Sequence, residues 1–231
     1  MYKYEIHLHT SGCSACAVSS VEDMVAAAKL HGYRGIVITN HFYRGNTGVD
    51  RRLSWNEFVG AYEREWLRGK AFGETTGVDV IFGIEEVYSK GKEVLIYGIT
   101  PDELKAETDF NHYDLEKISG FVRRHNGFLS HAHPFRARPY IPEPDKEPDA
   151  RFLDGVEVNN ANDPEERNKA AEIFAVKHGL RFTSGGDIHS ADSSNFGTSG
   201  IAVEERIKDT KTLAKVLHSG KYRIIVNGKI V

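Results

Sequence analysis

Two histidines near the start of the sequence, His7 and His9, have the spacing of metal ligands. They stand two positions apart at the end of the β-branched run "YEIHL". Side chains two apart in a strand point to the same face, and Glu5 shares that face. A single H-x-H pattern is more often an ordinary polar strand face, so further evidence is needed to assign a metal site.

Similar side chains stand at the ends of four other runs that are predicted to be strands. They are His41 after "GIVITN", Glu85 in "VDVIFGIEE", His131 and His133 closing "GFLSHAH", and Asp187 and His189 at the end of and just after "LRFTSGGD". In barrels and parallel sheets the carboxyl ends of the strands meet at one edge, where binding sites form. Imidazole and carboxylate together suit Zn, Mn or Fe, and one carboxylate can bridge two cations. Chance poorly explains such side chains at five strand ends, so the sequence predicts a metal site.

The segments between these runs have the period of amphipathic helices. Helices are expected to begin near Ser20, Ser54, Asp114 and Asp163, and a last one to run from about Thr210 to His218. Alternating strands and helices predict a parallel sheet with helices packed outside it, either open or closed into a barrel. The proline-rich segment "PFRARPYIPEPDKEPD" is the exception, and we expect a long loop of the kind that is often functional.

The composition is that of an ordinary globular protein. The 231 residues are 40% hydrophobic, with 30 Lys and Arg against 33 Asp and Glu. This balance creates no global positive field, so we expect no extended nucleic-acid binding. No apolar run is long enough for a bilayer, and "MYKYEIHLH" lacks a signal-peptide core. We therefore expect a cytoplasmic protein that does not bind membranes. Nothing in the sequence indicates an oligomeric state.

As an ordered set, these motifs resemble the PHP (polymerase and histidinol phosphatase) family of metal-dependent phosphoesterases. The matching pieces are "HLH", "GIVITNH", "GIEE", "HAHPF", "EVNN" and "GGDIH", in the family's order over about residues 4 to 190. The resemblance implies an α/β fold, a distorted (β/α)7 TIM-like barrel, formed here by one domain over residues 1–231. It also implies two to three divalent metal ions at the carboxyl-terminal mouth of the barrel.

The resemblance assigns ligands to these ions. The first metal would be held by His7, His9, Glu85 and Asp187. Glu85 would bridge to a second metal that His133 also holds, and His41 and His189 would serve a third. His131 matches no ligand of the motif and is a candidate for contact with the substrate or with a ligand.

Two departures from the family pattern affect the predicted number of metals. After Glu85 the family usually offers another histidine, but "EVLIYGIT" has Leu95 or Thr100 at the plausible alignments. The second metal is therefore expected to lack one ligand. In addition, "TNH" replaces the commoner "TDH", which removes a carboxylate beside His41.

A third departure concerns Cys13 and Cys16, which stand at C-x-x-C spacing after His9. Here the family usually supplies Asp or His, and "SGCSACA" has neither. A zinc ribbon needs two C-x-x-C pairs, and no thioredoxin cue accompanies this one. The two cysteines cannot build a disulfide framework and fit a reducing compartment. A structural role, metal contact and redox chemistry all stay open.

The expected activity is hydrolysis of a phosphate mono- or diester by a metal-activated hydroxide, on a small phosphorylated metabolite, a nucleotide or a short oligonucleotide. His189 and His131 are the candidates to protonate the leaving group. Arg44, Arg136 and Arg138 are the candidates to bind phosphate oxygens, although solvated loop arginines explain them equally well. Two alternatives are a related metal-dependent hydrolase of an amide or lactone, and a degenerate metal-binding module without catalysis.

Overall fold

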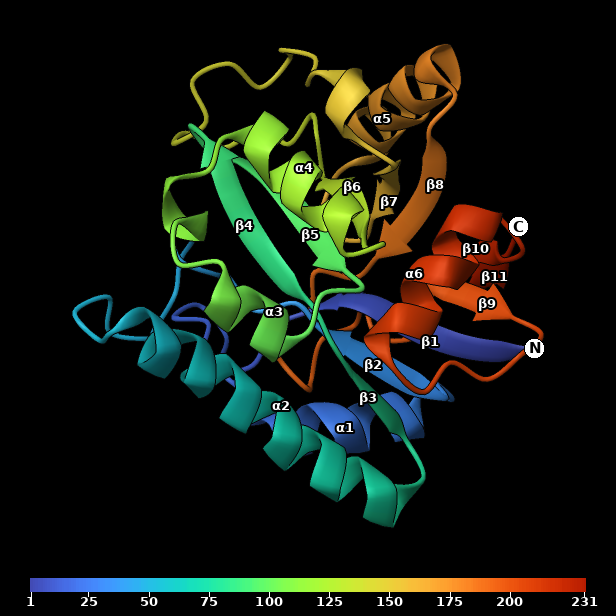
Figure 1. The fold of residues 1–231 in the computed structure, drawn as a ribbon. Helices are drawn as coiled ribbons and strands as arrows, with labels where there is room; N and C mark the ends of the chain where they lie inside the picture. The colour runs from blue at the N-terminus through green and yellow to red at the C-terminus, as the bar shows by residue number, and fades with distance from the viewer.

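Strands and helices alternate along the chain, and the computed structural model describes all residues 1–231 (Figure 1). In chain order they are β1 (Tyr2–Leu8), α1 (Val21–Leu30), β2 (Gly35–Ile38), α2 (Trp55–Thr76), β3 (Asp79–Phe82), β4 (Ile84–Ser89), β5 (Lys92–Tyr97), α3 (Pro101–Ala106), α4 (Leu115–Arg124), β6 (Phe128–Ala132), β7 (Gly155–Asn160), α5 (Glu165–His178), β8 (Arg181–Gly185), β9 (Ile201–Val203), α6 (Thr210–Ser219), β10 (Arg223–Val226) and β11 (Lys229–Ile230). The predicted alternation is confirmed, whereas α3 and β9 were not expected.

The strands form two sheets. One has the order β11-β10-β9-β1-β2-β3, and the other has the order β4-β5-β6-β7-β8. Within them β1, β2 and β3 are parallel, as are β6, β7 and β8, but β5 runs antiparallel to both β4 and β6. The α/β class is confirmed, and in place of the expected distorted (β/α)7 barrel the strands form these two sheets, which do not close into a continuous barrel. Isolated bridges join them, at Leu8 with Ile188 and at His41 with Glu85.

The barrel stays open because the run "VDVIFGIEE" is not one strand. It breaks at Gly83, so that β3 joins one sheet and β4 the other. A Cβ atom at Gly83 would lie 3.0 Å from Val37 and 3.3 Å from the Ile96 carbonyl oxygen, so a side chain would be crowded at this crossing. A tight turn at Gly91, whose φ is 72°, then returns the chain as the antiparallel strand β5.

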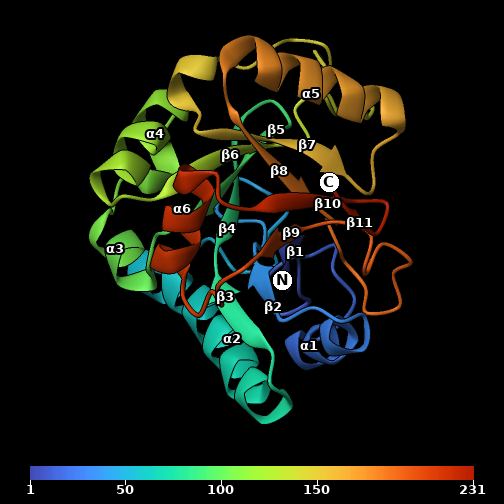
Figure 2. The same ribbon diagram turned by 90° about the vertical axis from the view of Figure 1, so that its right-hand side faces the viewer.

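The helices cover the outer faces of both sheets. α1 and α2 pack beside each other against β2 and β3, while α4 and α5 lie over β6 and β7 (Figures 1 and 2). Two predicted caps are present: the Ser20 side chain accepts the Asp23 N–H, and Ser54 forms a capping box with Glu57. The cap predicted at Asp163 is wrong, because the N-cap of α5 is Pro164, which has no side-chain hydrogen bond. No helix is both long and apolar enough to cross a membrane.

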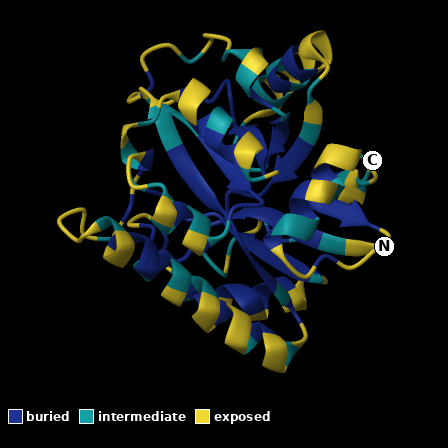
Figure 3. Cartoon of the chain, viewed as in Figure 1, coloured by how far each residue is buried: buried dark blue, intermediate teal, exposed yellow.

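Burial is concentrated in the strands and in the inward faces of the helices (Figure 3). The buried set nevertheless includes several ionisable side chains. Glu5, His7, His9 and Glu85 each have no exposed surface. Because a buried charge is costly unless it is paired or binds a metal, these residues need a specific explanation.

Candidate metal centre

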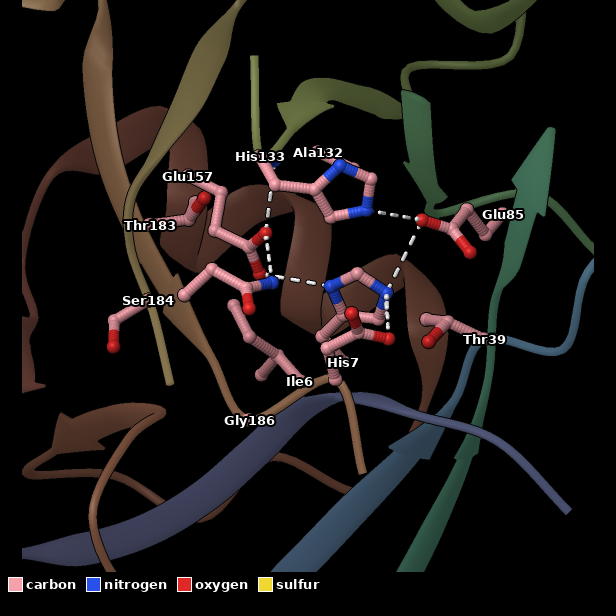
Figure 4. A network of polar contacts seen from close by, with 12 residues as sticks. Ile6, His7, Thr39, Glu85, Ala132, His133, Glu157, Thr183, Ser184 and Gly186 are labelled. Atoms are coloured by element: carbon pink, nitrogen blue, oxygen red, sulfur yellow. Dashed lines mark hydrogen bonds and ion pairs between the residues drawn. The ribbon is translucent and has the colours of Figure 1, made fainter. Parts of the chain in front are cut away.

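The predicted metal ligands come together where the two sheets meet, and Figure 4 shows three of them, His7, Glu85 and His133. The full set is His7, His9, His41, Glu85, His133, Asp187 and His189. Candidate ligand atoms of His7, His9 and Glu85 lie within 4.8 Å of one another. Those of His9, His41 and His189 do so as well. Residues far apart in the sequence therefore form one cluster.

Glu85 lies at the centre of this cluster. Its Oε1 is 3.2 Å from His7 Nε2 and 3.1 Å from His133 Nε2. Its Oε2 is 2.8 Å from His41 Nδ1. Both carboxylate oxygens thus face imidazole nitrogens from different strands, which is the position a ligand shared by two cations needs.

Asp187 approaches the cluster from the end of β8. Its Oδ1 is 3.5 Å from His7 Nε2 and 3.3 Å from His9 Nε2. The backbone has φ of 49° at Asp187 and 28° at His133, a left-handed conformation that costs roughly 1–3 kcal/mol in a residue with a side chain. Such strain is typical of functional sites, because the surrounding contacts hold the residue where the chemistry needs it.

Several buried atoms in the cluster have no hydrogen-bond partner. They include His7 Nε2, His9 Nε2, His41 Nδ1 and Glu85 Oε2. Each such atom costs about 1–3 kcal/mol unless something else binds it. The Glu157 carboxylate can only accept a hydrogen bond, so in the neutral His7 ring the Nδ1 that lies 2.9 Å from it carries the proton and Nε2 keeps its lone pair. This donor set fits a divalent cation.

The electrostatics of the cluster support the same interpretation. Burial favours the neutral ring of His7, but the charges of Glu157 and Glu85 outweigh it and hold the His7 pKa well above its ordinary value. Burial likewise opposes ionisation of Glu85, yet His7 and His41 hold its pKa well below the usual range. Without a metal, a proton is therefore shared between the His7 ring and the carboxylates that face it. A divalent cation would take its place.

Glu157 of β7 holds two of the histidines in position (Figure 4). Its Oε1 accepts from His7 Nδ1, while Oε2 accepts from the His133 backbone N–H at 3.0 Å and from Asn160 Nδ2 at 2.8 Å. A Cβ atom at Gly185 would lie 2.4 Å from both Glu157 Oε1 and His7 Cβ, so only glycine permits this approach. Sequence reasoning matched Glu157 within "EVNN" and gave it no role.

We expect Glu157→Gln to lower metal affinity by about 10- to 100-fold, the usual effect of losing a partner that orients a ligand. The amide keeps the size of the side chain but loses the charge that fixes the His7 tautomer. Competition with a chromophoric chelator measures the affinity. Glu166→Gln, at an exposed position of α5, is the matched control. Equal affinity in both variants would contradict this role.

Glu93 of β5 supplies a carboxylate that the sequence did not indicate. Its Oε2 is 3.6 Å from His133 Nε2, and its Oε1 is 3.7 Å from His41 Nδ1. Burial, and then the nearby charge of Glu85, raise the pKa of Glu93 to about 7. An acidic side chain therefore stands at the place where a ligand of the second metal was expected to be missing.

The two cysteines have different surroundings. Cys13 is buried in the apolar core, with 1% of its surface exposed. Cys16 is exposed, and its thiol lies within hydrogen-bonding reach of the rings of His189 and His41. Burial opposes ionisation of Cys16, but hydrogen bonds from these two histidines outweigh it and lower the pKa to about 6.

Asn40, which replaces the aspartate of the commoner motif, supports the segment after β1. Its Oδ1 accepts from the Thr10 backbone N–H at 2.7 Å and from Ser14 Oγ at 2.9 Å. Ser14 Oγ in turn lies 3.1 Å from His9 Nδ1. Asn40 thus fixes the orientation of the His9 ring through Ser14.

The two candidates for proton transfer differ in how their ring nitrogens are used. His189 Nδ1 donates to the Asp187 carbonyl oxygen at 2.9 Å, which leaves Nε2 for a ligand or substrate. His131 uses both nitrogens, with Tyr88 Oη at 2.9 Å and the Ala132 carbonyl oxygen at 2.8 Å, and burial lowers its pKa to about 3. Proton transfer by His131 would require the loss of one of these bonds. Both catalytic roles stay predictions.

The three arginines also differ. Arg136 is buried, and its guanidinium contacts Asp163 and Asp187, each at 2.8 Å. Arg138 has a side chain 42% exposed, at the surface beside Asp163. Arg44 has Nε 3.5 Å from Glu86, and its buried Nε and Nη2 have no hydrogen-bond partner. Of the three, Arg44 has guanidinium donors to spare.

A hollow of about 550 Å³ opens over the metal ligands. Its lining includes Cys16, His41, Arg44, Glu93, Arg136, Tyr140, Asp187 and His189. Three of the predicted ligands, His41, Asp187 and His189, therefore line a space that a phosphate-sized group can enter. Tyr140 and Arg136 come from the proline-rich segment, which is a long loop as predicted.

Comparison with protein-family models gives no match, and comparison with curated proteins gives no significant match. Among solved structures, a two-domain protein from Bacteroides vulgatus that contains a predicted PHP-like metal-dependent phosphoesterase has a TM-score of 0.69 and 13% identity, over 99% of this chain and 66% of that one. The lesion-specific endonuclease EndoQ of Pyrococcus furiosus has a TM-score of 0.66 and 14% identity, over 96% of this chain and 57% of that one. An amidohydrolase from Chromobacterium violaceum has a TM-score of 0.56 and 14% identity, over 81% of this chain and 88% of that one.

The chain spans less than two thirds of the length of the first two of these proteins. At such low identity the likeness concerns the fold. Over nearly its whole length, this chain has the fold of the PHP-like metal-dependent phosphoesterases, as its motifs predict.

Proposed function

We propose that this chain is a PHP-type metal-dependent phosphoesterase that hydrolyses a phosphate mono- or diester. The observation that carries the proposal is the buried cluster around Glu85, in which one ring nitrogen each of His7, His9 and His41 and one Glu85 oxygen lack hydrogen-bond partners. It lies beneath a hollow lined by Arg44, in a fold shared with a phosphoesterase and an endonuclease.

His7, His9, Glu85 and Asp187 would hold one divalent ion. Glu85 would also bind a second ion, together with His133 and Glu93. His41 and His189 would bind a third. Zn, Mn and Fe all suit these donors. Such ions, when bound, supply an activated water and neutralise the charge of a phosphate ester.

The remaining residues would bind and position the substrate. Arg44 is fixed by Glu86, which is fully buried and accepts the Arg44 backbone N–H at 2.9 Å. Its free guanidinium donors would bind phosphate oxygens in the hollow. Arg136, already engaged by two carboxylates, would hold Asp187 in place. His189 has one free nitrogen, Nε2, and would protonate the leaving oxygen only where the third metal position is empty.

The substrate would be a small phosphorylated metabolite, a nucleotide or an oligonucleotide. The expectation against extended nucleic-acid binding depended on the net charge of −3. A neighbour in fold is an endonuclease, so that expectation has no support from the comparisons. Longer nucleic acids therefore belong among the substrates to be tested.

Turnover of p-nitrophenyl phosphate and its diester, with added Mn, Zn or Fe(II) and with loss on chelation, tests the proposal. The alternative activity, hydrolysis of an amide or lactone, is supported by the similarity in fold to the amidohydrolase from Chromobacterium violaceum. Turnover of an amide or lactone panel without turnover of any phosphoester would favour that alternative. Bound metal without turnover in either panel would indicate the non-catalytic module.

We expect Arg44→Ala to lower kcat/KM for a phosphoester by about 10- to 100-fold, because a charge-assisted hydrogen bond is worth about 1.5–3 kcal/mol. Metal content should stay unchanged, since Arg44 lies outside the ligand cluster. Arg52→Ala is the control, because this arginine of the same loop has 90% of its side chain exposed. Steady-state kinetics of the two variants make the comparison. Equal kcat/KM values would contradict phosphate binding by Arg44.

A further inference from the structure

We propose that Cys16 is a sulfur ligand of one of the metal ions, together with His41 and His189, and that this site selects Zn²⁺ over Mg²⁺ or Mn²⁺. The inference rests on the proposed metal-dependent function. It goes beyond that function by naming a ligand and the class of metal.

Three imidazoles lie close together, and two of them, His41 and His189, line the same hollow as Cys16. The ring centroid of His9 is 4.2 Å from that of His189 and 4.3 Å from that of His41. His9 is fully buried, and its Nε2 has no hydrogen-bond partner. The Nδ1 atoms of His9 and His189 are held by Ser14 and by a backbone carbonyl, so Nε2 is the free nitrogen in both rings. A cation is the partner that such converging lone pairs require.

The loop that carries Cys16 is fixed on both sides to the segments that carry these histidines. Before Cys16, the Ala15 backbone N–H donates to the Asn46 carbonyl oxygen at 2.9 Å, in the loop that follows His41. After Cys16, the Val18 N–H donates to the His189 carbonyl oxygen, also at 2.9 Å. The thiol is thereby held between two histidine-bearing segments, in the lining of the same hollow.

Two imidazoles and one thiolate form a mixed nitrogen and sulfur donor set that suits tetrahedral zinc, with the fourth position left for water or substrate. A soft thiolate favours Zn²⁺ over the hard cations Mg²⁺ and Mn²⁺, which prefer oxygen ligands. Cys13, buried in the apolar core, is not placed to supply this sulfur. The segment after His9 has neither Asp nor His, and Cys16 would provide the missing ligand there.

Cobalt(II) titration tests the inference without relying on activity. The wild type should show a thiolate-to-cobalt charge-transfer band in the near ultraviolet. Cys16→Ser should lose that band and bind the corresponding metal at least about 100-fold more weakly, while still binding the other equivalents. Cys13→Ala, the matched control, should keep the band. Zn²⁺ should displace the cobalt and abolish the band, and excess Mg²⁺ should not.

The outcomes separate this inference from the proposed function. Cobalt bound by the wild type without a charge-transfer band would overturn the role of Cys16 and leave the metal centre intact. An unchanged band in Cys16→Ser would do the same. A failure of the wild type to bind any cobalt or zinc would overturn both.

Discussion

Glu85→Gln is expected to lower kcat/KM for a phosphoester by more than about 100-fold, which exceeds the effect of losing a residue that only orients a ligand. In the structure Glu85 Oε1 faces His7 and His133 while Oε2 faces His41. Glutamine keeps the size of the side chain but removes the negative charge and one of the two acceptor oxygens. Its NH₂ group would also face ring nitrogens whose lone pairs are needed for metal. We therefore expect the occupancy of two adjacent metal positions to fall together.

The neighbouring acid provides the matched control. Glu86 is as deeply buried as Glu85 and lies on the same strand, but its carboxylate is directed to Arg44. Elemental analysis should therefore find the full metal content in Glu86→Gln and a reduced one in Glu85→Gln. Thermal unfolding shows whether both variants are folded. A Glu85→Gln protein with the metal content of the wild type would contradict the shared-ligand role.

The part of the site that the sequence predicted depends on parallel strands. His7 and His9 end β1, His41 follows β2, and Asp187 follows β8. Parallel strands present their carboxyl ends at the same edge of a sheet, so side chains at these ends lie close together whatever the length or conformation of the connecting loops. The local sequence pattern and a general rule of sheet topology are therefore sufficient to predict that these residues lie together.

Glu93 could not be found by the same rule, because β5 runs antiparallel to its neighbours. The family pattern predicts another ligand after Glu85, near the carboxyl end of the next strand, where this chain has Leu95 or Thr100. In an antiparallel strand the amino end lies at that edge, and Glu93 pairs there with Ala132. The direction of β5 was hidden, because "VDVIFGIEE" gave no clear sign of the break at Gly83 that starts the antiparallel hairpin.

Glu157 and the arginines show a second limit of sequence reasoning. The motif "EVNN" indicates that an acid lies in the site, but the contact of that acid with His7 depends on the missing side chain at Gly185. Arg44 and Arg136 are equally plausible phosphate ligands in the sequence. The structure distinguishes the two arginines by their partners, since Arg136 is already bound to two carboxylates.

Removal of the metal ions is expected to lower the melting temperature by roughly 5–10 °C. A ligand present at 100 times its Kd stabilises a protein by about 2.7 kcal/mol. Each kcal/mol shifts the melting temperature of a domain of this size by about 2–4 °C. The physical cause lies in the buried cluster. Without metal, one ring nitrogen each of His7 and His9 and one oxygen of Glu85 are buried with no hydrogen-bond partner.

The shift should also depend on pH. Carboxylates raise the pKa values of His7 and His41 well above normal in the metal-free protein, so protons compete with metal for these rings. Metal affinity should therefore rise with pH, and the difference in melting temperature should be larger at mildly alkaline than at mildly acidic pH. Calorimetry before and after chelation measures it, with Glu85→Gln as the variant in which the difference should shrink. Equal melting temperatures with and without chelator would contradict the proposal, because a cluster so deeply buried cannot bind metal without a gain in stability.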